Sequence, residues 1–326
     1  MGDLGVIETA GELVLASSEL GWAGRLLAEC AAGELREHGP SGATVEVRVE
    51  RSRRAFDTRG WAPLGRDACR HDGEVVLRDA CRAGFDMHLR CDPTLSRFTF
   101  RWRPPLLTRS AALALRIRAR MLSRAVLLHF PAMWFAGTKG RVPIHAPAVR
   151  VGDSTLLLAG NSGVGKTTFI QGKTELGFPA TGDNLSVTDG RTVWGVVEPM
   201  RSAGGGGRRM TYGRREASMA SRVSALVPDR IVVLRGDVES RVATVDPHAA
   251  ERALVTGTYM AGELRRFWPF AALLAAGTGL GPSHPPVVEA ARELSVRLPA
   301  IEAGLPDLAG DAFERLAAIS RAGRWT

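Results

Sequence analysis

Lysine is almost absent from this chain of 326 residues, although lysine and arginine together number 43. It occurs only at Lys139, Lys166 and Lys173. Arginine therefore supplies nearly all of the positive charge behind the formal net charge of +9. Such an excess favours acidic peptides, phosphorylated ligands or loosely held nucleic acid as partners. No zinc-finger, aromatic-basic or clear helix-turn-helix pattern is present, so we expect no specific nucleic-acid recognition.

Long hydrophobic runs are also lacking. The two longest apolar stretches, at residues 127–136 and 267–276, are much shorter than the roughly 20 residues that a membrane span requires. The first residues carry no basic segment of a signal peptide, and Val6 stands where a myristoylation signal has Ser or Thr. We therefore expect a cytoplasmic protein that neither spans nor is anchored to a membrane.

Cysteine is too rare for a disulfide scaffold, and no CxxC pair occurs. The four cysteines are Cys30, Cys69, Cys81 and Cys91. His71 and His88 lie near three of them in the sequence, which leaves a metal site open. We favour the alternative, in which all four are buried, reduced thiols.

The sequence of the N-terminal third predicts a small α+β domain. Residues 1–104 contain the strand-like segments TVEVRVE, HDGEVVLRD and SRFTFRWRP and a short apolar helix near residues 23–34. The pair Pro104-Pro105 marks its end. Because these residues form a separate unit, we hypothesise a role in recognising the substrate.

Residues 105–127 predict one long helix between two domains. They contain no Gly or Pro after position 105, and Thr108 or Ser110 is a candidate N-cap. Four arginines fall on or near its polar side: Arg116, Arg118, Arg120 and Arg124. We interpret this side as a solvated basic face in preference to a dedicated binding helix.

A phosphate-binding motif follows. Residues 160–167 read GNSGVGKT and satisfy GxxxxGK[ST], in which glycines let backbone N–H groups face the phosphates. The lysine contacts the outer phosphates and the threonine contacts Mg²⁺. The residues expected to hold the nucleotide are Gly160, Asn161, Ser162, Gly163, Val164, Gly165, Lys166, Thr167 and Thr168.

The segments around the motif predict hairpins. AVRVGDSTLLLAG reads as two strands that turn at Gly152-Asp153, with the second strand leading into the loop. A helix is expected over residues 166–176, with Gly177 as its C-terminal cap. NLSVTDGRTVWGVVEP predicts a second hairpin with a type I′ turn at Asp189-Gly190. Such surroundings argue against a doubly wound GTPase.

An acidic residue must complete the Mg²⁺ shell, and Asp183 in GFPATGDN is the best candidate. Asp183 could instead cap a turn, because Gly-Asp-Asn is turn-prone. The strand RIVVLRGD ends in Arg235, which makes Asp237 a less natural choice. The base-recognition and switch sequences of GTPases and the signature of ABC transporters are missing, so switch and transporter functions are disfavoured.

Together these motifs resemble the kinase domain of the HPr kinase/phosphorylase family, which shares a P-loop fold with phosphoenolpyruvate carboxykinase. The family pattern has His-Gly or His-Ala, a strand pair, GxSGxGKS[TE], a helix that ends in Gly, and Asp-Asp before a hairpin. His145-Ala146, the motif at 160–167 and Asp183-Asn184 match it in that order. The resemblance covers residues 128 to about 300 and implies nothing about the N-terminal domain.

The resemblance implies that His145 lies near the transferred phosphate, that Asp183 is the general base or an Mg²⁺ contact, and that Asn184 is a second Mg²⁺ contact. Asn184 departs from the pattern because an amide oxygen can bind metal but cannot accept a proton. The charged signature of the true HPr enzyme is approximated only by Glu198 and Arg201. A biosynthetic relative that modifies a peptide or metabolite is therefore the better match.

A glycine- and arginine-rich segment, residues 201–215, has the composition of a mobile cationic lid over phosphates or an acidic substrate. An ordinary surface loop is the alternative.

We thus expect an α/β protein with a small N-terminal α+β domain (1–104), a bridging helix (105–127), and a P-loop kinase domain (128–326) with a mixed, hairpin-rich sheet and C-terminal helices. The expected activity is transfer of the γ-phosphoryl group from Mg²⁺-ATP to a hydroxyl of a peptide serine or small metabolite, with Asp183, His145 and Lys166 as catalytic residues and Thr167, Asp183 and Asn184 around Mg²⁺. GTP is not excluded. The acceptor could be acidic or phosphorylated, and the family resemblance suggests a homo-oligomer. The alternative is a nucleotide-gated binding protein without phosphotransfer.

Overall fold

The computed structural model describes residues 2–36, 42–92, 94–202, 208–210, 214–236 and 242–304. The helices are α1 (Gly21–Cys30), η1 (Ala80–Arg82), α2 (Leu106–Ala114), α3 (Arg116–Arg124), η2 (Ala125–His129), α4 (Phe130–Thr138), α5 (Lys166–Glu175), α6 (Pro247–Met260), α7 (Phe267–Thr278) and α8 (Val287–Arg297). The strands of the N-terminal half are β1 (Gly2–Thr9), β2 (Glu12–Ser18), β3 (Val45–Glu50), β4 (Ala62–Gly65), β5 (Ala68–His71), β6 (Glu74–Leu77), β7 (Phe85–Cys91) and β8 (Ser96–Trp102). The strands that follow are β9 (Val142–Ile144), β10 (Ala148–Val151), β11 (Ser154–Ala159), β12 (Ser186–Thr188), β13 (Val193–Gly195), β14 (Met200–Ser202), β15 (Arg208–Arg209), β16 (Arg215–Ala217), β17 (Ala225–Leu226), β18 (Arg230–Arg235), β19 (Ala243–Val245) and β20 (Ala300–Gly304).

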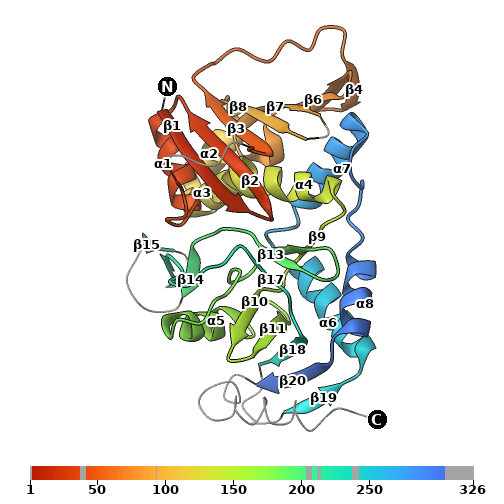
Figure 1. The fold of residues 1–326 in the computed structure, drawn as a ribbon. Coiled ribbons are helices and arrows are strands. Elements are labelled where there is room, and N and C mark those ends of the chain that lie inside the picture. The colour runs from red at the N-terminus through yellow and green to blue at the C-terminus, as the bar shows by residue number, and fades with distance from the viewer. Residues whose placement is uncertain are drawn as a thin grey trace.

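The N-terminal half forms an eight-stranded sheet with the order β1-β2-β3-β8-β7-β6-β5-β4. It lies at the top of Figure 1. In β3, apolar and polar residues alternate as expected for a strand with one buried face. Val45, Val47 and Val49 are buried, and the residues between them are more exposed. β3 runs parallel to β2 and β8, and the other pairs are antiparallel. All three strands predicted here are confirmed.

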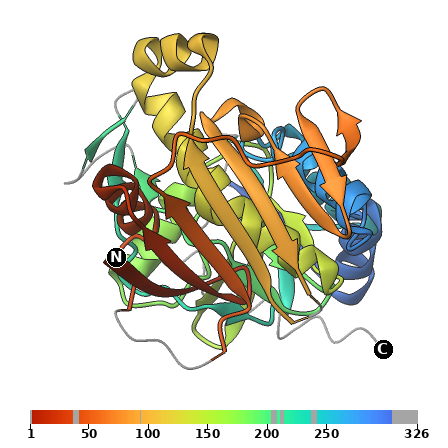
Figure 2. The same cartoon turned by 90° about the horizontal axis from the view of Figure 1, so that it is seen from above.

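The single bridging helix predicted over 105–127 is wrong. Helix α2 begins after Pro105 and ends at Ala114, because the backbone angles of the next residue, Leu115 (φ −120°, ψ 50°), are not helical. Neither predicted N-cap is correct, because Thr108 and Ser110 both lie inside α2 and Pro105 occupies the N-cap position. The Thr108 hydroxyl instead donates to Asp79 Oδ2 at 2.5 Å. Helix α2 buries none of its residues and stands away from the body of the molecule in Figure 2, so no packing holds it in line with α3.

The helical path instead continues through η2, a π-helical turn, into α4. Seven of the nine residues of α4 are buried, and the helix packs under β2 and β3. Helix α7 packs against β4, β5 and β6, which Figure 1 shows at the right of the sheet. Both helices fall within the predicted kinase domain, 128–326, yet they help to bury the N-terminal sheet. The packing therefore crosses the predicted boundary at residue 128.

The second half contains several sheets and makes the fold a mixed α/β structure. One has the order β10-β11-β18-β20-β19, in which β11, β18 and β20 are parallel and both edge strands are antiparallel. Another has the order β17-β13-β12-β9. Both predicted hairpins, β10–β11 and β12–β13, are confirmed. The C-terminal helices α6, α7 and α8 are present as predicted, with β19 before them and β20 after them in the sequence.

The turn of the second hairpin differs from the predicted type I′ turn. A type I′ turn needs positive φ at both central residues, but only Gly190 (φ 84°) of the Asp189-Gly190 pair has it. Asp189 instead accepts hydrogen bonds from the backbone N–H groups of Arg191 and Thr192. The aspartate side chain thus stabilises a longer loop.

No helix in the described ranges is long and apolar enough to cross a bilayer.

A buried carboxylate ties the two halves together. Glu12 in β2 is 1% exposed and accepts hydrogen bonds from Thr44, Lys139 and Arg141 at 2.6–2.8 Å. The Arg141 guanidinium also lies 4.2 Å from the ring centre of Trp194 in β13. This cluster connects the N-terminal sheet, the segment after α4 and the second hairpin.

We expect Glu12→Gln to lower the free energy of unfolding by about 3 kcal/mol, because it removes the anion from between two cations. The measurement is urea denaturation. Glu46→Gln is the matched control, since Glu46 forms a surface pair with Arg97 and should cost less than about 1 kcal/mol. Equal losses in the two variants would show that Glu12 has no special role.

Candidate functional site

The predicted phosphate-binding motif forms the turn between β11 and α5. Gly165 precedes the first turn of α5 with φ 104°, a conformation that favours glycine and lets the chain enter the helix directly from the loop. As predicted, α5 begins at Lys166 and is followed by Gly177 with positive φ. The N-terminal N–H groups of a helix that starts in this way can bind an anion.

Lys166 is 4% exposed and its ammonium faces the loop. Its Nζ donates to the backbone oxygens of Gly160 at 2.6 Å and Asn161 at 3.0 Å. Burial lowers the pKa of Lys166 to about 8, although Asp183 and Glu263 favour the charged form. The ammonium is therefore held over the loop, where a phosphate would give it a charged partner.

This pKa predicts the pH dependence of nucleotide binding. Below about pH 8 Lys166 is already charged in the free protein, whereas above it anion binding requires uptake of a proton. The dissociation constant for ATP should therefore rise with pH above 8, approaching about tenfold per unit. Titration with a fluorescent ATP analogue measures it. Lys166→Arg keeps its charge and should remove this rise; an identical rise in that variant would assign it to another group.

Asp183 is 1% exposed and lies beside the loop. Its Oδ2 accepts from Thr167 Oγ1 at 3.3 Å and from the backbone N–H of Arg201 at 3.4 Å. Burial raises its pKa, against the opposing effects of Arg201 and these hydrogen bonds. Its other oxygen, Oδ1, is buried without a hydrogen-bond partner among the described residues. A threonine hydroxyl and an unused carboxylate oxygen fit the Mg²⁺ contacts predicted for this place.

His145 is 4% exposed and lies near Lys166. Its backbone N–H donates to Thr258 Oγ1 at 3.1 Å, whereas Nδ1 is buried without a partner among the described atoms. Burial, followed by the charge of Lys166, lowers the pKa of His145 to about 4; Glu263 and a hydrogen bond with Asn184 oppose this shift. The imidazole is thus neutral near pH 7. The structure brings five of the predicted residues, His145, Lys166, Thr167, Asp183 and Asn184, into one site.

Glu263 is a member of the site that the sequence did not indicate. Arg201 donates to Glu263 at 2.9 Å and to Glu198 at 2.6 Å. Burial raises the pKa of Glu198 to about 7, with Arg201 opposing the shift. Glu198 Oε1 has no partner among the described atoms. Glu198 and Arg201, noted from the sequence only as a partial match, form a charge cluster next to Asp183.

Helix α6 supports the loop from the other side. A Cβ at Gly257 would lie 2.9 Å from the Gly160 backbone oxygen, so only glycine allows this approach. The next residue, Thr258, holds the backbone of His145. Gly257 stands inside a helical pattern, and such a glycine can indicate close packing. The sequence could not show what it packs against, because Gly160 is about a hundred residues away.

The predicted lid, 201–215, can be described only in part, because residues 203–207 and 211–213 lie outside the described residues. The described parts belong to a small sheet with the order β14-β16-β15. Arg201 is engaged with Glu198 and Glu263, and Arg208 lies 3.3 Å from Glu29. Arg201 is therefore part of the site and not a free lid cation.

The cysteines are only partly as expected. Cys30 is buried, but Cys69, Cys81 and Cys91 are half-buried. In the described part of the chain, no three His, Cys, Asp or Glu side chains gather as a metal-binding group. Asp237, the less favoured Mg²⁺ candidate, lies outside the described residues.

Comparison with known proteins gives weak structural similarity and no match in sequence. No protein-family model and no curated protein matches the chain. Among solved structures, the chain is similar to the Hpr(Ser) kinase/phosphatase from Coxiella burnetii, with 10% identity and a TM-score of 0.29 over 55% of this chain and 96% of that one. This similarity is too low to place the chain in that family.

Proposed function

We propose that the protein is an Mg²⁺- and ATP-dependent kinase that phosphorylates a hydroxyl of a peptide serine or small metabolite in specialised biosynthesis. The contact between Thr167 and the buried Asp183, beside Lys166 in the glycine-rich loop, carries this proposal. A hydroxyl, a carboxylate and an ammonium placed in this way are what phosphoryl transfer from a nucleotide requires. GTP could replace ATP, because no described contact distinguishes the bases.

Each residue has a definite role in this proposal. Lys166 and the loop N–H groups bind the phosphates, and Thr167, Asp183 and Asn184 would hold Mg²⁺, which would neutralise charge on the phosphate oxygens. The acceptor oxygen attacks the γ-phosphorus as the bond to the β-phosphate oxygen breaks and ADP leaves. Asp183 accepts the hydroxyl proton, because the amide of Asn184 beside it cannot. Neutral His145 positions the γ-phosphate by a hydrogen bond.

The proposal is tested by measuring the products that form from the nucleotide. The protein is incubated with Mg²⁺-ATP and with extracts that contain candidate acceptors, and ADP and inorganic phosphate are measured separately. A kinase forms ADP without an equal amount of inorganic phosphate, because the phosphoryl group remains on the acceptor. Nucleotide binding with no ADP formed, or with inorganic phosphate equal to ADP, would favour the nucleotide-gated binding protein.

A further inference from the structure

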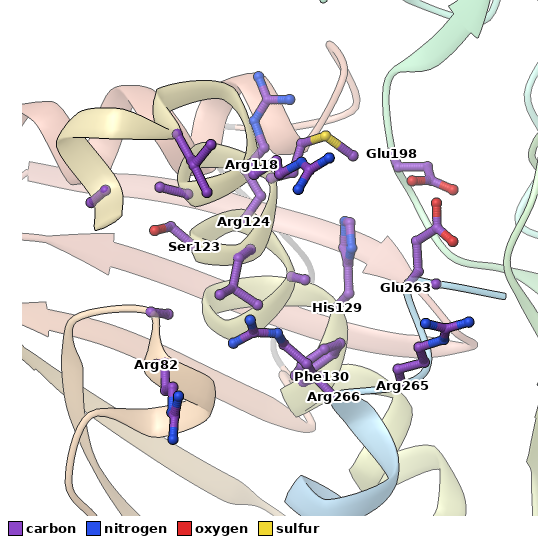
Figure 3. Close-up of a pocket in the computed structure, with 18 of the residues that line it drawn as sticks. Arg82, Arg118, Ser123, Arg124, His129, Phe130, Glu198, Glu263, Arg265 and Arg266 are labelled. Carbon is purple, nitrogen blue, oxygen red and sulfur yellow. The ribbon is translucent and has the colours of Figure 1, made fainter. Parts of the chain in front are cut away.

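A large pocket opens between the N-terminal half and the proposed catalytic residues. Its volume is about 740 Å³, within the range of pockets that hold small ligands. Helices α2, α3 and η2 form one side, and residues 198–201 and 262–266 form the other. Figure 3 shows Glu198 and Glu263 on one side, with Arg124 and His129 of the helical side near them and Arg82 farther away.

The pocket carries a surplus of positive charge. Six arginines and three glutamates line it: Arg82, Arg118, Arg124, Arg201, Arg265, Arg266, Glu198, Glu216 and Glu263. Every glutamate is paired with a buried or half-buried arginine, because Glu216 binds Arg124 and the other two bind Arg201.

The remaining arginines lie at the rim. Arg82, Arg118 and Arg265 are exposed and have no carboxylate within ion-pair distance among the described residues. Arg266 is also exposed and donates to the backbone oxygen of Cys81. These four residues, which we call the rim arginines, leave their charge free for a ligand.

The inner end of the pocket lies next to the proposed catalytic group. Arg201 lines the pocket and donates its backbone N–H to Asp183. Glu198 Oε1 is buried there without a partner among the described atoms. Buried Phe130 and Leu185 supply apolar surface between this end and the rim. A ligand can thus have a polar group near Asp183, an apolar middle and an anionic end.

We propose that this pocket binds the phosphoryl acceptor and that the rim arginines recognise a carboxylate or phosphate group on it. This inference rests on the proposed kinase function and names its substrate class: an anionic molecule with a hydroxyl. Guanidinium groups bind carboxylates and phosphates through paired, charge-assisted hydrogen bonds. The acceptor enters with its hydroxyl toward Asp183, and its anionic group remains at the mouth of the pocket.

The experiment compares ligands with and without an anionic group. The probe pairs are glycerate and glyceramide, glycerol phosphate and glycerol, and serine pentapeptides with flanking glutamate or glutamine. Calorimetry without nucleotide measures binding to the unchanged protein, to the double variant Arg118→Ala/Arg265→Ala and to Arg116→Ala. Arg116 lies on the same helix and is exposed, but it does not line the pocket.

We expect the anionic member of at least one pair to bind about tenfold more tightly than its neutral partner. In the double variant the two members of that pair should bind almost equally, whereas in Arg116→Ala the preference for the anionic member should persist. The pair that shows the preference indicates whether the acceptor is a small molecule or a peptide. Equal binding within every pair, or a preference that survives in the double variant, would overturn the inference even if phosphotransfer occurs. A rim-dependent preference without phosphotransfer on adding Mg²⁺-ATP would retain the anion site and reject the kinase function.

Discussion

Asp183→Asn should lower the rate of phosphoryl transfer by about 10²- to 10⁴-fold, the usual contribution of a general base. The amide can still accept hydrogen bonds from Thr167 and from the Arg201 backbone, so the local geometry is retained. What it loses is the ability to accept a proton. Nucleotide affinity should change little, because Lys166 and the loop remain. Single-turnover kinetics and a nucleotide titration measure the two effects separately.

Asp189→Asn is the matched control for this prediction. Asp189 is an exposed carboxylate six residues away that only accepts backbone hydrogen bonds in a turn. Asparagine can make the same contacts, so both rate and stability should be preserved. Full turnover in Asp183→Asn with unchanged nucleotide binding would contradict the role of Asp183 as the base.

Lys166→Ala should weaken nucleotide binding strongly and lower turnover even further. Its Nζ is buried over the loop, and no other lysine lies between the loop and residue 173. Loss of one charge-assisted contact to phosphate corresponds to roughly 10- to 100-fold in affinity. The same group also stabilises charge that develops during transfer, so the rate at saturating ATP should fall further. Calorimetry with Mg²⁺-ATP measures the first effect.

Lys173→Ala on the same helix is the control. Lys173 is half-buried and its ammonium lies 5.4 Å from the ring centre of Phe169. This substitution should reduce stability slightly and leave ATP affinity within about twofold. Equal losses of ATP affinity in the two variants would mean that positive charge on α5 in general, and not Lys166 at the loop, attracts the nucleotide.

The sequence predicted best what depends on neighbouring residues. The glycine-rich turn, helix α5 and both hairpins follow from local spacing, and the structure confirms these elements. The meeting of Asp183 with Thr167 was predicted from a family resemblance and from the chemistry that such a loop requires. The nucleotide, the metal ion and the acceptor remain predictions.

The sequence predicted poorly what depends on distant packing. A continuous helical pattern over 105–127 contained no sign that α2 would bury nothing while α4 entered the core. Glu263 lies more than sixty residues beyond Arg201 and was not recognised, because one glutamate in a helical region has no local signature. The pocket proposed for the acceptor combines segments from both halves, so no motif could indicate it.

Intact-mass analysis of acceptors tests the central claim most directly. Anionic hydroxyl compounds and serine peptides are incubated with Mg²⁺-ATP and the protein, with Lys166→Ala as the paired reaction. We predict that at least one acceptor gains a single phosphoryl group with the unchanged protein and none with the variant. No gain on any acceptor while ATP binding is intact, or an equal gain with Lys166→Ala, would contradict the account.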